Sequence, residues 1–174
     1  MYTQDFLNIL DEVLGIEGGR TNYAWDPGGD TVFGISKHYW PKYWEYGPPG
    51  VELAYKFYWE EFWVPLRLAD LAQEALRFEI FDTAVNCGGH NAVVFAQRAY
   101  NLLRPRNWPV INPDGVIGPK TIGALNHMCQ RYTAALLGGC NYYQADYYAH
   151  LGDALKEEAI RGWFAKRLAW SVDE

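Results

Sequence analysis

The sequence predicts a predominantly α-helical fold of the α+β class, with seven to eight helices and one short β-hairpin. Apolar residues recur every three or four positions through most of the chain, the spacing that places them on one helix face. A turn-rich stretch at residues 20–34 departs from that spacing. The chain has 174 residues, 49% of them hydrophobic and 21% charged, which suffices for one ordinary domain with a buried core.

The first helix is predicted over residues 3–16, because its apolar residues share one face. Gly18 and Gly19 end this helix, since glycine readily adopts the left-handed conformation that closes a helix. A strong turn signal, Asp26-Pro-Gly-Gly, follows between aromatic and β-branched residues. Residues 20–34 are therefore predicted to form a loop or a short hairpin.

Helical spacing resumes after the hairpin. The pattern predicts helices over residues 36–39, 51–63, 69–87, 91–103 and 120–128, followed by two more that break near Gly152. Ser36 is expected to cap the first of these and Pro41 to end it, while Asp70 is expected to cap the helix of residues 69–87. Residues 104–118 contain three prolines and are predicted to be a loop.

Charge and hydropathy exclude two classes of partner. The net charge of −6 argues against nucleic acid, because neutralising phosphates requires clustered Lys and Arg. The charge is uneven, with a net −8 over residues 1–87 and +2 over residues 88–174. The apolar runs are too short to span a bilayer, and residues 1–15 lack the basic start of a signal peptide. No membrane insertion is expected.

The cysteines and histidines argue against two other enzyme classes. Cys87, Cys129 and Cys140 are predicted to be buried thiols of a chain made in a reducing cytoplasm. The four histidines are scattered, so we expect neither a zinc amidase nor any metal or cofactor. A cysteine peptidase built on Cys87 and His90 is disfavoured, because the end of a helix opposes a thiolate.

Glu17 is the residue that a purely structural interpretation explains least well. A carboxylate in the last turn of a helix faces the negative end of the macrodipole, at a cost of about 0.3–1 kcal/mol. That placement, beside an apolar helix face, raises the pKa of a carboxyl group, as a general acid near neutral pH requires. Taken alone, the position of Glu17 favours an exposed residue before a helix end over a catalytic one.

Asp26 and Thr31 extend this pattern towards glycosidase chemistry. A glycosidase uses one carboxyl group to protonate the leaving oxygen and a second to activate water, and Glu17 and Asp26 are candidates for these roles. The hydroxyl of Thr31 is a candidate for holding that water. Each residue also has a structural interpretation, since Asp before Pro-Gly-Gly favours a turn and Thr favours a strand.

Two stretches of the sequence resemble a known family. Glu17-Gly-Gly, Asn22 and the run from Asp26 to Ser36 resemble the signature of the phage-type N-acetylmuramidases of glycoside hydrolase family 108. The spacing of Glu17, Asp26 and Thr31 is also similar to the catalytic residues of T4-type phage lysozymes, with one residue fewer before the Thr. Residues 81–88 and 114–121 resemble the second half of the same family, described as a peptidoglycan-binding region.

The resemblance implies a lysozyme-like fold and cleavage of the β-1,4 bond between N-acetylmuramic acid and N-acetylglucosamine. It implies Glu17 as the catalytic acid, Asp26 as a nearby carboxylate and Thr31 as a supporting residue. Residues 1–90 would form the muramidase region and residues 91–174 the peptidoglycan-binding region. We expect a monomer made in the cytoplasm of a bacterial host, which reaches periplasmic peptidoglycan through a separate holin-type pore. A bacterial muramidase serving a secretion system is also compatible with the family.

Further residues are candidates for binding the glycan. The flat rings of Tyr23, Trp25 and Phe33 suit the apolar faces of sugars, although most aromatic residues belong to cores. Asp82 and Asn86 share a helix face and either reach the substrate or form a buried hydrogen-bond pair.

The outcome of the reaction depends on the separation of the two carboxyl groups. A distance of about 6.5–9.5 Å favours inversion and about 5–5.5 Å favours retention, while attack by the C6 hydroxyl would give an anhydro sugar. The lysozyme-like spacing favours inversion. A non-catalytic peptidoglycan-binding module is the alternative to an enzyme, although such a module has no use for Glu17.

Overall fold

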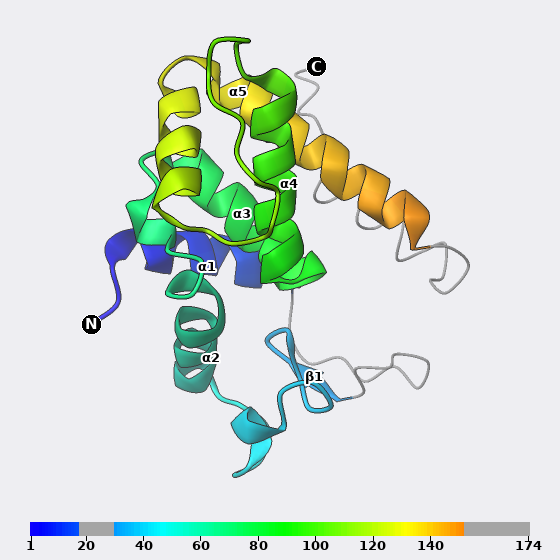
Figure 1. Ribbon diagram of the computed structural model, residues 1–174. Helices are drawn as coiled ribbons and strands as arrows, with labels where there is room; N and C mark the ends of the chain where they lie inside the picture. Colours follow the sequence, from blue (N-terminus) through cyan, green and yellow to red (C-terminus); the bar gives the residue numbers. More distant parts are fainter. Residues whose placement is uncertain (18–29, 152–174) are drawn as a thin grey trace, which may run out of the picture. The chain divides into compact units, whose positions relative to one another are not determined.

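A computed structural model of the chain describes residues 1–17 and 30–151, without the side chains of residues 16 and 17 (Figure 1). The chain forms two compact units, residues 1–65 and residues 66–174. The described ranges contain five α-helices, one π-helical segment, two 3-10 turns and a two-stranded antiparallel sheet. The prediction of a mostly helical chain with a short hairpin is confirmed, and the predicted number of seven to eight helices is wrong.

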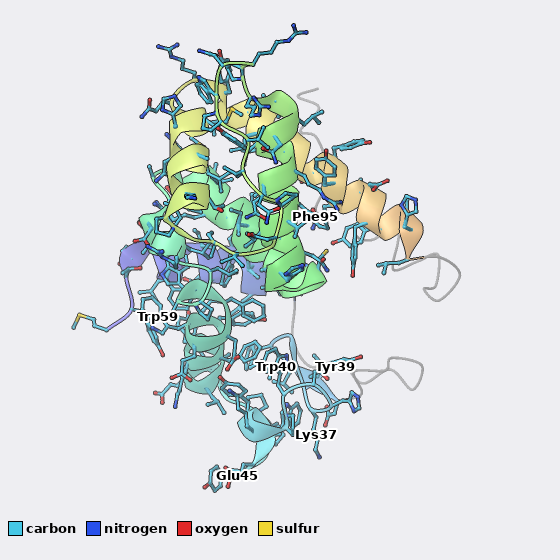
Figure 2. All side chains as sticks on the ribbon, in the orientation of Figure 1. Lys37, Tyr39, Trp40, Glu45, Trp59 and Phe95 are labelled. Atoms are coloured by element: carbon cyan, nitrogen blue, oxygen red, sulfur yellow. The ribbon has the colours of Figure 1, made fainter. Side chains whose placement is uncertain are left out.

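The first helix, α1 (Gln4–Glu17), confirms the helix predicted over residues 3–16. Its buried face presents Phe6, whose ring lies 5.0 Å from that of Trp59 and 5.3 Å from that of Trp63. Trp59 is labelled in Figure 2. The Tyr55 hydroxyl donates a 2.6 Å hydrogen bond to Asp11 on the same helix. Ring packing and this bond hold α1 in the first compact unit.

The short helix predicted over residues 36–39 is absent, and residues 37–39 form a turn. Ser36 does accept a hydrogen bond from the Tyr39 amide, at 3.3 Å. Trp40, however, has φ −127° and ψ 53°, because the residue before a proline is disfavoured in the α region. Pro41 therefore begins the 3-10 helix η1 (Pro41–Trp44) instead of ending a helix.

The helix predicted over residues 51–63 consists of two parts. Helix α2 (Val51–Tyr58) passes into the π-helical segment η2 (Trp59–Trp63), where the Val64 amide bonds to the Trp59 carbonyl at 3.0 Å. The wider turn brings the rings of Trp59 and Trp63 to a stacked arrangement, 6.2 Å apart and 15° from parallel. Rare π-helical turns of this kind place side chains that a regular helix would direct elsewhere.

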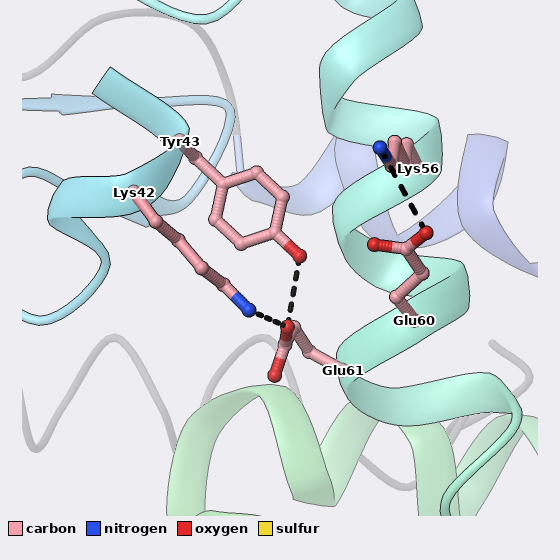
Figure 3. Close-up of polar contacts among 5 residues, drawn as sticks. All are labelled: Lys42, Tyr43, Lys56, Glu60 and Glu61. Carbon is pink, nitrogen blue, oxygen red and sulfur yellow. Dashed lines mark hydrogen bonds and ion pairs between the residues drawn. The ribbon is translucent and has the colours of Figure 1, made fainter. Parts of the chain in front are cut away.

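A polar cluster of Lys42, Tyr43 and Glu61 joins η1 to η2 (Figure 3). One Glu61 oxygen accepts hydrogen bonds from Lys42 Nζ at 2.6 Å and from the Tyr43 hydroxyl at 2.8 Å. Burial acts to raise the pKa of Glu61, but the two hydrogen bonds and the Lys42 charge outweigh it, so the pKa is lowered. Burial and the adjacent Glu61 raise the pKa of Tyr43. The cluster therefore contains an ionised carboxylate and a neutral phenol.

The second compact unit begins with the 3-10 turn η3 (Leu68–Asp70) and helix α3 (Glu74–Cys87). The predicted start of this helix at residue 69, with Asp70 as its cap, is wrong. The Asp70 carboxylate instead accepts a hydrogen bond from Arg67 Nε at 2.9 Å and pairs with its Nη2 at 2.6 Å. Asp70 lies inside η3, and Leu71 after it is extended, with φ −83° and ψ 129°, so α3 begins only at Glu74, five residues after the predicted start.

Helices α4 (Gly89–Leu103) and α5 (Pro119–His150) account for most of the second unit. Helix α4 confirms the prediction for residues 91–103, and residues 104–118 form the predicted loop between the helices (Figure 1). The helix predicted over residues 120–128 instead continues to His150, with a kink at Tyr132, whose φ is −131°. This continuity lowers the number of helices. The glycines in α5 would weaken an isolated helix, and packing against α4 compensates for this weakness.

Close packing of α4 on α5 depends on Gly139. A Cβ atom added at Gly139 would lie 2.8 Å from the Ala99 Cβ and 3.1 Å from Leu103 Cδ1. Cys87, Cys129 and Cys140 are buried free thiols in this unit, as predicted. No helix in the described part of the chain combines the length and apolarity needed to cross a bilayer.

We predict that Gly139→Ala lowers the free energy of unfolding by about 1–3 kcal/mol, because the added methyl group overpacks the contact between α4 and α5. Gly123→Ala is the control on the same helix, since nothing lies within 4 Å of its added Cβ. The control is expected to raise stability by about 0.5–1 kcal/mol through helix propensity. Urea unfolding of both variants measures this, and a gain of stability for Gly139→Ala would contradict the proposed close packing.

We predict that Glu61→Gln lowers stability by about 1 kcal/mol at pH 7, since it weakens charge-assisted hydrogen bonds. A carboxylate with a lowered pKa stabilises the fold above its unfolded pKa, and this contribution disappears as pH falls through the folded value. The difference from wild type should therefore begin to shrink as pH falls below the ordinary pKa of Glu, about 4.3, and should vanish only below the lower pKa of Glu61 in the folded protein.

Glu60→Gln is the matched control for Glu61, because Glu60 lies 3.9 Å from Lys56 and both side chains are about half exposed (Figure 3). An exposed pair at this distance contributes at most about 0.5 kcal/mol. Chemical unfolding at pH 7 and at pH 3 measures both variants, and equal losses at pH 7 would refute the role assigned to Glu61.

Candidate functional site

The predicted hairpin consists of strands β1 (Thr31–Val32) and β2 (Ile35–Ser36), paired antiparallel with Thr31 opposite Ser36. Phe33 and Gly34 form its turn, with φ of 50° and 73°. Positive φ at both central residues is the geometry of the tight hairpin turns that match strand twist. The turn costs Phe33 backbone strain, since a bulky residue is rarely found at positive φ.

Two buried aromatic donors fix this hairpin within the first compact unit. The Tyr58 hydroxyl donates a 2.8 Å hydrogen bond to the Phe33 carbonyl, and Trp44 Nε1 donates to the Ile35 carbonyl at 3.2 Å. Tyr58 comes from α2 and Trp44 from η1. The strained turn at Phe33 is therefore held by neighbouring elements, as strain at functional loops requires.

The structure places the predicted catalytic residues as follows. Glu17 is the last residue of α1, a helix with no basic residue in its last turn, and its side chain lies outside the described residues. Thr31 is half-buried on β1. Asp26, Tyr23 and Trp25 lie outside the described residues. The structure therefore describes the end of α1 and the hairpin, which precede and follow residues 18–29 in the chain. The catalytic roles of Glu17, Asp26 and Thr31 remain predictions.

The predicted binding residues fall in both units. Phe33 is half-buried in the hairpin turn, and its carbonyl accepts the Tyr58 bond. Asp82 is buried on α3, and Asn86 donates a 2.7 Å hydrogen bond to the Asp82 main-chain carbonyl. Asn86 thus contacts the backbone of Asp82, and the roles of both residues in substrate binding remain predictions.

Glu79 is a carboxyl group that the sequence interpretation missed. Burial, followed by the charge of Asp82, raises the pKa of Glu79 to about 7. Its contact with the Thr83 hydroxyl is long, at 3.4 Å, so no strong hydrogen bond offsets burial. Burial also raises the pKa of the Cys140 thiol, and the Glu79 charge adds to this shift. The spacing of Glu79 and Asp82, three residues apart on a largely apolar helix, was the available signal.

A hollow of about 330 Å³ lies beside the Lys42–Tyr43–Glu61 cluster of the first unit. Its lining combines two lysines, two glutamates and apolar surface: Lys42, Tyr43, Glu45, Tyr46, Gly47, Pro48, Leu53, Lys56 and Glu60. A second and larger hollow, of about 560 Å³, lies in the second unit between the loop of residues 104–118 and α5. Across the described ranges, no three His, Cys, Asp or Glu side chains gather as metal ligands would.

Comparisons with known proteins agree with the sequence resemblance. The family profile Glycosyl hydrolase 108 matches residues 10–88, and the profile Predicted Peptidoglycan domain matches residues 91–168. No curated protein matches the chain significantly. The fold is similar to the solved structure of Brucella abortus SagA, with a TM-score of 0.68 and 22% identity over 92% of this chain and 83% of that one.

The two profiles cover successive, non-overlapping stretches, and the first includes both α1 with Glu17 and the hairpin. Asp82 and Asn86 also fall within the first profile, whereas α5 and the part of α4 from Asn91 onward fall within the second. The chain therefore consists of a glycosyl hydrolase 108 domain followed by a predicted peptidoglycan domain.

Proposed function

We propose that the protein is an N-acetylmuramidase that cleaves the β-1,4 bond between N-acetylmuramic acid and N-acetylglucosamine in peptidoglycan. The observation that carries this proposal is the glycosyl hydrolase 108 domain over residues 10–88, joined in one chain to a predicted peptidoglycan domain. A glycosidase linked to a domain for the bacterial wall has the wall glycan as its natural substrate.

Glu17 is the proposed general acid. Its backbone ends α1, where the helix macrodipole opposes a negative charge, and no basic residue lies in that turn to offset this effect. Such a position favours the protonated carboxyl group that must transfer a proton to the glycosidic oxygen. Proton transfer of this kind contributes about 10²–10⁴-fold to a reaction rate.

Asp26 and Thr31 are the proposed partners of Glu17. In this assignment, the Asp26 carboxylate activates a water molecule and the Thr31 hydroxyl helps to orient it. Support comes from the hairpin, whose first strand carries Thr31 and whose turn is fixed by Tyr58 and Trp44. A rigid support matters because a misplaced catalytic group loses much of its effect.

The cellular context is a separate part of the proposal. We infer that the protein acts on periplasmic peptidoglycan after it has been made in the cytoplasm, and that another protein supplies its passage through the inner membrane. An endolysin of a bacteriophage and a muramidase of a bacterial secretion system both fit this route.

We predict that Glu17→Gln abolishes clearing of permeabilised Gram-negative cells, with a rate at least about a hundredfold below wild type. Glu12→Gln is the matched control, because Glu12 is an exposed carboxylate on the same helix. The decrease in turbidity with time measures clearing, and circular dichroism verifies that both variants are folded. Equal clearing by Glu17→Gln and wild type would reject Glu17 as the acid, and no clearing by wild type would favour a non-catalytic wall-binding module.

We predict that hydrolysis inverts the anomeric centre, so that the new N-acetylmuramic acid end first appears as the α-anomer. An inverting mechanism follows if water is activated between two separated carboxyl groups. Proton NMR of early product, recorded before mutarotation, distinguishes the anomers. A β-anomer at early times would indicate retention and contradict the role proposed for Asp26.

A further inference from the structure

We propose that the second compact unit binds the stem peptide of peptidoglycan in the groove between the loop of residues 104–118 and the first half of α5. This inference rests on the proposed function, since it names the part of the wall that the predicted peptidoglycan domain holds. The groove has a volume of about 560 Å³, within the usual range of ligand pockets. Its lining residues are Tyr100, Trp108, Pro109, Val110, Ile111, Pro119, Lys120, Gly123, Ala124 and His127.

One wall of the groove is irregular backbone that α4 holds in a defined position. Asn101 donates to the Ile111 carbonyl at 2.7 Å and accepts from the Ile111 amide at 3.0 Å. The Tyr100 hydroxyl donates to the Pro109 carbonyl at 3.0 Å, and Arg104 Nη1 donates to the Trp108 carbonyl at 2.7 Å. Tyr100 and Asn101 lie in the last turn of α4, and Arg104 directly follows its last residue, so the end of one helix positions this wall.

Gln97, one turn earlier on α4, fixes the end of the loop. This fully buried amide accepts a 2.9 Å hydrogen bond from the Gly115 amide and donates to the Val116 carbonyl at 3.2 Å. It also donates to Asp114, whose carboxylate accepts the Val116 amide at 2.9 Å. A groove whose backbone is already ordered loses little conformational entropy when it binds a ligand.

The ring faces of Trp108 do not provide a platform for sugars. Tyr100 stacks on Trp108 with centroids 6.4 Å apart, and the His127 ring meets it edge-on at 4.2 Å. Tyr132 adds a third ring contact at 6.3 Å. The Trp108 indole is therefore in contact with other rings of the protein. The remaining apolar lining of the groove consists of aliphatic side chains and prolines. Such a surface suits the methyl groups of alanine residues better than a flat sugar ring.

The charge of this region suits an anionic ligand. Residues 88–145 contain five Lys or Arg and a single acidic residue, Asp114, in a chain whose net charge is −6. Asp114 is engaged by Gln97 and the Val116 amide, whereas Lys120 is exposed at the groove. Val110, 66% exposed, supplies apolar surface beside it. The stem peptide of peptidoglycan combines alanine side chains with free carboxylates, and this matches both features.

The test uses the full-length protein and the two products of one amidase digest of purified peptidoglycan. The released stem peptides are titrated into wild type and the stem-free glycan strands into Glu17→Gln, which is predicted not to cut them, and calorimetry or tryptophan fluorescence gives each Kd. Wild type is expected to bind stem peptides, and Lys120→Glu is expected to weaken this binding at least about tenfold. Val110→Asn tests the apolar contact independently, because it removes apolar surface without changing the charge, and it is expected to weaken binding by a similar factor.

Arg131→Glu is the matched control, since it makes the same charge change at an exposed position of α5 outside the groove lining. It is expected to change the Kd less than about twofold in physiological salt, where distant charges are screened. Equal weakening by Lys120→Glu and Arg131→Glu, or binding of stem-free glycan in place of stem peptides, would overturn the groove assignment. The muramidase proposal is tested by a different measurement, the clearing of cells by wild type. If wild type clears cells, that proposal stands even when the groove assignment fails, and if wild type does not clear cells, that proposal is rejected.

Discussion

Irregular backbone next to the candidate sites depends on side chains from helices for its hydrogen bonds. In the described part of the chain the sheet has only two short strands, so most loop carbonyls and amides must find other partners. In the first unit, Tyr58 bonds to the hairpin turn, and in the second unit Gln97 and Asn101 bond to the loop between α4 and α5. Because buried polar groups are costly when unpaired, these bonds select one loop conformation.

The need to pair the polar backbone groups of loops explains why many aromatic residues have structural roles. They make up 17% of the chain, which on its own suggests a sugar-binding surface. Many rings instead pack on one another, such as Trp40 on Phe57 at 5.0 Å, and others donate hydrogen bonds to loops through a hydroxyl or indole nitrogen. Tyr39, 61% exposed, remains available on the surface of the first unit (Figure 2). Substrate contacts therefore depend on a few positioned groups more than on aromatic content.

The sequence predicted those parts of the fold whose signals are local. Helices α1 and α4 have regular apolar faces bounded by glycine or by a proline-rich loop, and both were predicted within two residues at each end. The start of α3 was missed because Leu71 is extended and separates η3 from α3. The continuity of α5 was missed because packing on α4 outweighs the low helix propensity of its glycines. The motif around Glu17 identified the family, but the groove at Lys120 depends on contacts such as Asn101 with Ile111, which periodicity does not reveal.

The proposed chemistry of the first domain is a single act: hydrolysis of a glycan bond in the bacterial wall. Mass spectrometry of purified peptidoglycan digested by the wild-type protein tests that act directly, because the mass of each fragment identifies the bond that was cut. We expect disaccharide-peptide fragments with a hydrated N-acetylmuramic acid at the new reducing end. Free stem peptides with intact glycan strands, or an anhydro end on every fragment, would contradict it.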